Sequence, residues 1–224
     1  MGAGPKSMKL RASIAFLAGL AASPLSPTYA TPLDELIEPE KDHSACFIRS
    51  YEVTHLRQHP RQKVTSMRVW LRYEQMPGDV EGLALDLGIG IVQRGDATPL
   101  FAQGDCVWDE HANVNTSDRR MIKEINKDEA AVCMTSAQPD VFESTSAEEG
   151  GYLLLDRGKN NDTLMVYLPD SLTMVKRSAR RKHLSIKFGP DDRVFMLRRT
   201  NLKDCAAVED AVTTPEPGVE PRSR

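Results

Sequence analysis

Hydrophobic and polar residues alternate along much of the chain with a period of two, which is the pattern of β-strands. In 63–74, KVTSMRVWLRYE, the alternation places Met67, Val69 and Leu71 on one face and mainly polar residues, with Trp70 among them, on the other. The segment 83–91, LALDLGIGI, alternates most regularly. Further strand candidates are the aromatic and β-branched segment CFIRSYEVT (46–54), the alternating segment 183–188, and the apolar runs 152–155, 164–168, 172–175 and 194–197.

Turn-forming residues separate these segments, as in PGD (77–79), GKNND (158–162) and GPDD (189–192). Because short links join antiparallel neighbours, we expect a meander of four or five strands over 152–199. The main helix candidate is 117–131, with the alternatives of a loop or a strand. Eight to ten alternating strands predict an all-β fold, either a single antiparallel barrel or a two-sheet sandwich, with at most one or two short helices.

The first thirty residues have the layout of a secretory signal peptide. A basic head precedes nine apolar residues at 14–22, and small residues end the segment at Ala30. The apolar run is shorter than the roughly 20 residues of a membrane-spanning helix, so an N-terminal anchor is the disfavoured alternative. We therefore divide the chain into a signal peptide (1–30), a linker (31–45), a disulfide-bonded β domain (46–208) and a disordered tail (209–224).

The charge balance disfavours one class of partner. The chain has 29 basic and 32 acidic residues, and the signal peptide contains three of the bases and no acid, so the mature chain carries a net charge of about −6. Nucleic-acid-binding domains are usually basic, so we expect no nucleic-acid partner. No apolar stretch after the signal is long enough to cross a bilayer, so we expect no transmembrane segment.

The cysteines agree with export to the periplasm or the medium. There are four, an even number, and none forms a C-x-x-C pair. In an oxidising compartment this predicts two disulfides, for which the sequence allows three pairings. Because Cys46 opens the first strand candidate and Cys205 follows the last, we favour a bond between them. Cys106 and Cys133 would then close a shorter loop.

The segment GDCVWDEHANV (104–114) concentrates reactive residue types. In a strand, Cys106 and Trp108 share one face, which favours a disulfide packed against an aromatic ring. The alternative is a metal or acid–base site formed by Asp109, Glu110 and His111. Consecutive strand residues point to alternating sides, so these three side chains converge only if the strand has ended.

Two histidines, His55 and His59, have the i, i+4 spacing of metal ligands on a helix. Pro60 disfavours helical geometry at His59, so we expect a polar turn. The glycines of GIG (88–90) lack the third glycine of a dinucleotide motif, and we expect them to permit a bend or close packing. No G-x-S-x-G nucleophile motif is present. We therefore predict no catalytic residue, no metal and no cofactor.

A basic run, KRSARRKH (176–183), lies between two strand candidates and predicts an exposed hairpin loop. Such a loop can bind an anionic glycan, lipid or phosphate. The competing interpretation is a solvated turn that protects an edge strand from aggregation. The possible anion-binding residues are Lys176, Arg177, Arg180, Arg181 and Lys182.

Three segments resemble a set of small exported bacterial proteins for which no activity is established. They are ACFIRSYEVTHLRQHPRQKVTSM (45–67), GDCVW (104–108) and DDRVFMLRRTNLKDC (191–205). The resemblance covers most of the mature domain, and the final motif with its terminal cysteine is its most specific part. It implies export and a cysteine-tied β domain. It implies no activity, and it supplies no catalytic residues to carry over to this chain.

These observations lead to the expectation of an exported, non-enzymatic binding module of the bacterial cell envelope. Its ligand would be an envelope protein or an anionic glycan or lipid, and the oligomeric state stays open. The alternative is an envelope hydrolase that uses Asp109, Glu110 and His111 together with His55 and His59. A third possibility is a structural envelope protein that buries an apolar patch in an oligomer.

Overall fold

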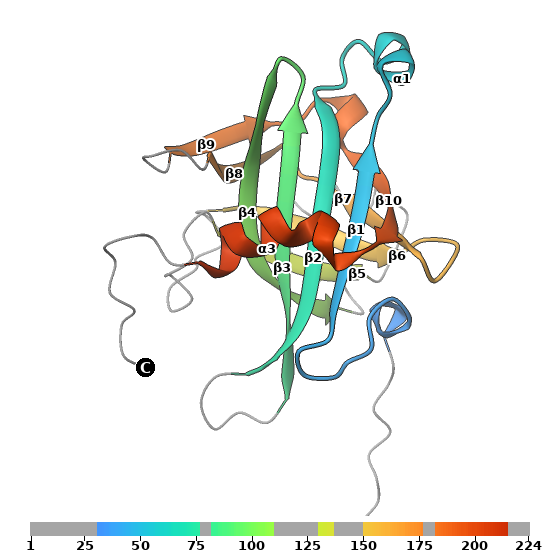
Figure 1. Ribbon diagram of the computed structural model, residues 1–224, viewed down its shortest axis with the longest axis vertical. Coiled ribbons are helices and arrows are strands. Elements are labelled where there is room, and N and C mark those ends of the chain that lie inside the picture. The colour runs from blue at the N-terminus through green and yellow to red at the C-terminus, as the bar shows by residue number, and fades with distance from the viewer. Residues whose placement is uncertain (1–30, 77–81, 110–129, 137–149, 177–181, 215–224) are drawn as a thin grey trace, which may run out of the picture.

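The computed structural model of the 224-residue chain describes residues 31–76, 82–109, 130–136, 150–176 and 182–214 (Figure 1). The strands are β1 (Ser44–Ser50), β2 (Val64–Gln75), β3 (Leu83–Gln93), β4 (Asp96–Asp109), β5 (Ala130–Ser136), β6 (Tyr152–Arg157), β7 (Thr163–Tyr167), β8 (Ser171–Lys176), β9 (Lys182–Lys187) and β10 (Val194–Thr200). The helices are α1 (Val53–Gln58), α3 (Ala206–Thr213) and three 3-10 turns: η1 (Pro32–Glu35), η2 (Pro190–Asp192) and η3 (Leu202–Cys205).

Eight of the strands form a closed up-and-down barrel. Strands β1 to β7 lie in sequence order around the ring and pair antiparallel with their neighbours. Strand β7 then pairs with β10, and β10 pairs with β1 to close the ring. The hairpin β8–β9 lies outside this ring and joins it through β4, at Leu100 and Phe101. The predicted all-β class is confirmed, and the architecture is the barrel, not the sandwich.

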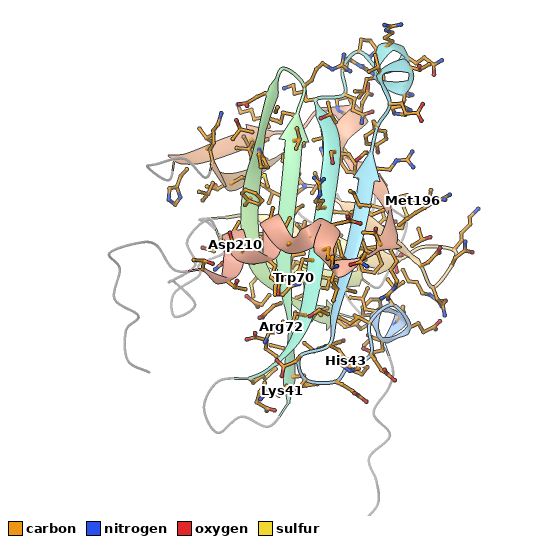
Figure 2. All side chains as sticks on the ribbon, in the orientation of Figure 1. Lys41, His43, Trp70, Arg72, Met196 and Asp210 are labelled. Atoms are coloured by element: carbon orange, nitrogen blue, oxygen red, sulfur yellow. A yellow bond between two sulfur atoms is a disulfide. The ribbon has the colours of Figure 1, made fainter. Side chains whose placement is uncertain are left out.

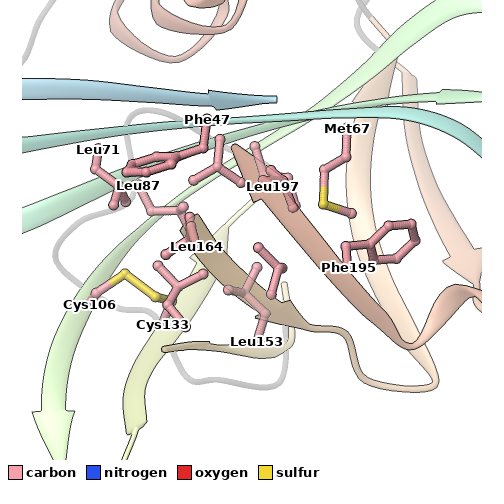
Figure 3. Packing of buried hydrophobic residues seen from close by; sticks show 14 of the residues in the cluster. Phe47, Met67, Leu71, Leu87, Cys106, Cys133, Leu153, Leu164, Phe195 and Leu197 are labelled. Carbon is pink, nitrogen blue, oxygen red and sulfur yellow. A yellow bond between two sulfur atoms is a disulfide. The ribbon is translucent and has the colours of Figure 1, made fainter. Parts of the chain in front are cut away.

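The alternating sequence pattern explains how the interior is filled. In β2 and β3 the odd-numbered apolar residues predicted to share a face, such as Met67, Leu71 and Leu87, are buried in the central cluster. Phe47, Leu153 and Leu197 reach the same cluster from β1, β6 and β10 (Figure 3). Side chains therefore pack the barrel from all sides, as is usual for a barrel of this strand number.

The outer face of β2, β3 and β4 is covered by α3 (Figure 1). Here Val208 packs directly over the two glycines of the GIG motif. A Cβ at Gly88 would lie 2.9 Å from one methyl of Val208, and a Cβ at Gly90 would lie 2.8 Å from the other. The predicted close packing at these glycines is confirmed, because only glycine leaves room for the helix.

The two disulfides have the favoured pairing. Cys46–Cys205 links β1 to the residue before α3, and its sulfurs are buried with Trp70 and Val208 on the outer face under that helix (Figure 2). Cys106–Cys133 joins directly opposite residues of β4 and β5 inside the barrel. In the chain-entropy model such crosslinks contribute about 3 to 5 kcal/mol each.

The ends of the folded region extend beyond the predicted domain of 46–208. The segment 31–45 is not a free linker, because Leu33, Leu36 and Ile37 are buried in the central cluster and β1 already begins at Ser44. At the other end α3 continues to Thr213. Both segments are short and bury only a few apolar residues, so neither shows a recognisable hydrophobic periodicity in the sequence.

Several predicted elements are wrong in detail. The segment 152–199 contains five strands, but β7 pairs with β10 and the hairpin β8–β9 is inserted between them, so it is not one meander. Val53 and Thr54 lie in α1 and not in the first strand. The helix candidate 117–131 lies mostly outside the described residues, and its last two residues belong to β5. A strand was not expected over most of β4 or β5, whose small and polar residues weaken the alternation.

The packing of α3 on the barrel can be tested at Gly90. We expect Gly90→Ala to lower the free energy of unfolding by about 1 to 3 kcal/mol, because the added methyl group overpacks the contact with Val208. Urea unfolding measures this change. When Val208→Ala is combined with Gly90→Ala, the double variant should lose less free energy of unfolding than the two single variants lose in sum. If the two losses simply add, the direct contact between these residues is contradicted.

Candidate functional site at the β1–β10 notch

The barrel has an incomplete seam between β1 and β10. These strands pair only at Cys46–Thr200, Phe47–Arg199 and Ile48–Arg198. Beyond Ile48, β1 remains paired with β2 while β10 remains paired with β7. The strands separate there and leave a shallow hollow of about 420 Å³, which we call the notch. It is lined by Arg49, Tyr51, His55, His59, Gln62, Asp191, Val194 and Met196.

A column of stacked groups forms one wall of the notch. The ring centroids of Tyr51 and His55 are 4.6 Å apart, and those of His55 and His59 are 4.3 Å apart. The guanidinium carbon of Arg49 lies 4.8 Å from the centre of the Tyr51 ring. The i, i+4 spacing brings the two histidines together because His55 lies in α1 and His59 caps it. The expected polar turn is therefore a short helix, which ends at His59 as Pro60 requires.

The stacked arrangement disfavours a metal site on these histidines. Their ring planes differ by only 24°, so the nitrogen lone pairs, which lie in the ring planes, do not converge on one point between the rings. Nε2 of His55 lies 3.0 Å from Oε1 of Gln62, whose Nε2 donates to the carbonyl of Val64 at 2.8 Å. The bond from Gln62 to Val64 fixes the orientation of the Gln62 amide, so its oxygen Oε1 faces His55. Because an amide oxygen only accepts, Nε2 of His55 is the donor.

Buried polar contacts fix this wall to the rim of the barrel. The carboxylate of Asp192, which is fully buried, accepts from the backbone N–H groups of Lys63 and Val64 at 2.8 and 2.9 Å. Nη2 of Arg94 donates to the carbonyls of Leu56 and His59 at the end of α1, at 2.8 and 3.1 Å. The notch is thus held in a defined shape by groups on β2, η2 and the β3–β4 turn.

The chemistry of the notch is cationic, aromatic and apolar. No ion pair within the described residues engages Arg49, whereas Asp191 is paired with Arg61 at 3.1 Å. Burial raises the pKa of Tyr51, so its phenol stays neutral. On the opposite wall the residues Val194 and Met196 are 49% and 44% exposed, which is high for apolar residues. Figure 2 shows Met196 on β10 at the side of the barrel. Such a surface suits a ligand with carboxylate and apolar groups.

The structure does not bring the residues of the hydrolase alternative together. His55 and His59 lie beside the start of β4, because Arg94, in the turn just before that strand, donates to the carbonyls of Leu56 and His59. Asp109 ends the same strand at the other end of the barrel (Figure 1). Thirteen residue steps along a strand span on the order of 40 Å. Glu110 and His111 lie outside the described residues.

Only the two ends of the basic run belong to the described part of the inserted hairpin. Lys176 ends β8 and Lys182 begins β9, while Arg177, Arg180 and Arg181 lie outside the described residues. Nζ of Lys176 forms an ion pair with Asp96 at 2.6 Å and lowers the pKa of that carboxyl to about 2. The anion-binding role of this run stays a prediction.

A second hollow of about 610 Å³ lies near the N-terminal segment, and its lining includes the acidic residues Asp34, Glu35, Glu38 and Asp42 as well as Arg199. Beside it, one donor atom each of Glu38, Glu40 and His43 lies within 4.8 Å of the others. Nε2 of His43 is already in contact with Glu40 at 3.1 Å. This cluster has the donor types of a metal site, but Glu38 and Glu40 are exposed and His43 is only partly buried.

A row of carboxylates crosses the outer face of β2, β3 and β4. Asp86 lies opposite Arg72 on one side and Asp105 on the other. Burial, together with the charges of Glu74 and Asp105, raises the pKa of Asp86 to about 7, and Arg72 opposes the shift. Burial also raises the pKa of Asp105. Asp86 therefore changes charge near neutral pH.

Comparison with known proteins adds no assignment. Neither the protein-family models, nor the curated proteins, nor the solved structures contain a match to this chain. Within the described residues, no helix combines the length and apolar character needed to cross a membrane.

Sequence reasoning found the histidines of the notch but missed Arg49, Val194 and Met196. The spacing of His55 and His59 was a usable signal, although it suggested a metal and not a stack. The other three residues become neighbours only because β10 returns to β1 and then separates from it. No local pattern encodes that event.

The shifted pKa of Asp86 predicts a pH dependence of stability. Because the folded pKa of about 7 exceeds the ordinary 3.8, the folded state binds this proton more tightly than the unfolded state. The contribution to the free energy of unfolding is fully present below pH 3.8 and is lost as the pH rises through about 7. Urea unfolding across this range should show a steeper decline for the natural protein than for Asp86→Asn. Parallel curves would contradict the assignment.

Proposed function

We propose that this protein is an exported, non-enzymatic binding module of the bacterial cell envelope, and that it binds a protein partner at the notch. Two disulfides in a small barrel suit an oxidising compartment, which supports the proposed location. The observation that carries the function is the notch itself. It combines an ordered cationic and aromatic wall with an apolar wall that is open to solvent.

The composition of the notch favours a polypeptide over a sugar or a lipid head group. A glycan or phosphate ligand would use Arg49 but would leave Val194 and Met196 without a partner. Aromatic residues, methionine and arginine are the residue types enriched at protein interfaces. A polypeptide offers both carboxylates for the cationic wall and apolar side chains for β10. An anionic ligand at the basic run 176–183 is a separate candidate that the sequence predicts.

The same geometry argues against catalysis at the notch. The stacked histidine rings contact Tyr51 and Gln62. Asp191, the acidic residue that lines the notch, is paired with Arg61. Among the described side chains that line the notch, none is a serine hydroxyl or a cysteine thiol. An acid–base or nucleophilic mechanism needs such groups in mutual contact.

Site-specific photo-crosslinking tests this proposal. We expect p-benzoylphenylalanine in place of Met196, in cells that export the protein, to form a covalent adduct with a polypeptide because this side chain faces the notch. Leu202 is the matched control, since it is apolar and 46% exposed but does not line the notch. Protease treatment of the adduct followed by mass spectrometry identifies it as protein.

The charge of the notch supplies a second control. In the Met196 crosslinking background, Arg49→Glu should reduce the adduct strongly because it reverses the charge on the cationic wall. Lys187→Glu on exposed β9 should leave the yield unchanged. Equal adducts from positions 196 and 202, or no polypeptide adduct at position 196, would refute a protein-binding notch.

A further inference from the structure

The notch contains a free strand edge as well as side chains. Residues of an antiparallel strand direct their N–H and C=O groups to alternate sides. On β10 the odd-numbered residues face β7, because Arg193 accepts from the N–H of Leu168 and Arg199 donates to the carbonyl of Asp162. The backbone groups of Val194 and Met196 therefore face the notch. Among the described strands, none pairs with them on that side.

The facing strand has the same property. Tyr51 donates its N–H to the carbonyl of Thr65, which fixes the odd-numbered residues of β1 toward β2. The backbone groups of Ser50 consequently point toward the notch, where β10 no longer meets them. Two short edges thus border one hollow of about 420 Å³. Exposed strand edges of this kind readily pair with another chain.

We infer that an extended segment of the partner protein adds to β10 as a strand within the notch. This inference rests on the proposed function and specifies the binding mode. Backbone hydrogen bonds to Val194 and Met196 would provide affinity, and alternate side chains would provide specificity. Charge complementarity defines the occupant, because the cationic wall of Arg49 calls for an acidic side chain on the segment. The exposed side chains of β10 call for apolar ones.

A selection of random dodecapeptides displayed on phage tests the binding mode. The natural protein is the target of the selection. Phage that bind the Met196→Pro variant are first removed from the library, because proline lacks the N–H that faces the notch. The bonds from β10 to β7 use the odd-numbered residues and stay intact. We expect the enriched peptides to alternate acidic and apolar residues. Their affinity should fall about tenfold on Met196→Pro but be retained on Met196→Thr, which keeps the N–H.

A second arm does not depend on the folding of any variant. The best peptide is synthesised in two forms, with N-methyl groups on either the odd-numbered or the even-numbered backbone amides. Strand addition uses one edge of the peptide, so one form should lose binding and the other should keep it. Equal behaviour of the two forms, or the absence of any enriched peptide, would overturn the inference. If a polypeptide adduct forms at position 196 but the two N-methylated peptides bind equally well, the proposed protein-binding function stands and only strand addition is overturned.

Discussion

Closure of the barrel between β1 and β10 is the constraint on which the rest of the structure depends. A fully paired ring leaves no strand edge exposed, whereas this chain closes its ring with only three paired positions between β1 and β10. The disulfide Cys46–Cys205 begins at one of these positions, since Cys46 pairs with Thr200. It fastens the seam to α3, which covers the outer face across β2, β3 and β4. A weak join is thus reinforced covalently at one end, and at the other end it opens into the notch.

Two features of the outer surface, the face covered by α3 and the notch, both depend on which residues lie at each point of the strands. Where small residues such as Gly88 and Gly90 face outward, a helix packs on the sheet and the strands stay close. After Arg49 and Tyr51 the chain turns away into α1, and this helix is bonded to Arg94 in the β3–β4 turn. The ring stack and the strand edge therefore share one cause, which is the departure of β1 from β10.

The sequence predicted those features that depend on local alternation. The strands β2 and β3, the inward faces of Met67 and Leu87 and the pairing of the cysteines follow from period-two patterns and chain order. Features that depend on which strands meet were not predictable. The insertion of β8–β9 between β7 and β10 and the placement of Met196 across the notch from the histidine stack require non-local pairing. The burial of Leu33 and Leu36 likewise depends on a barrel end that no local segment specifies.

Hydrogen exchange at the amides of β10 tests the account most directly, because it reports the state of the seam without any ligand or variant. If the seam is open, the N–H groups of Phe195 and Leu197, which face β7, exchange slowly. Those of Val194 and Met196, which face the notch, should exchange orders of magnitude faster. Equal protection of all four amides would mean that β10 has no free edge, and this would contradict both the open seam and the binding mode built on it.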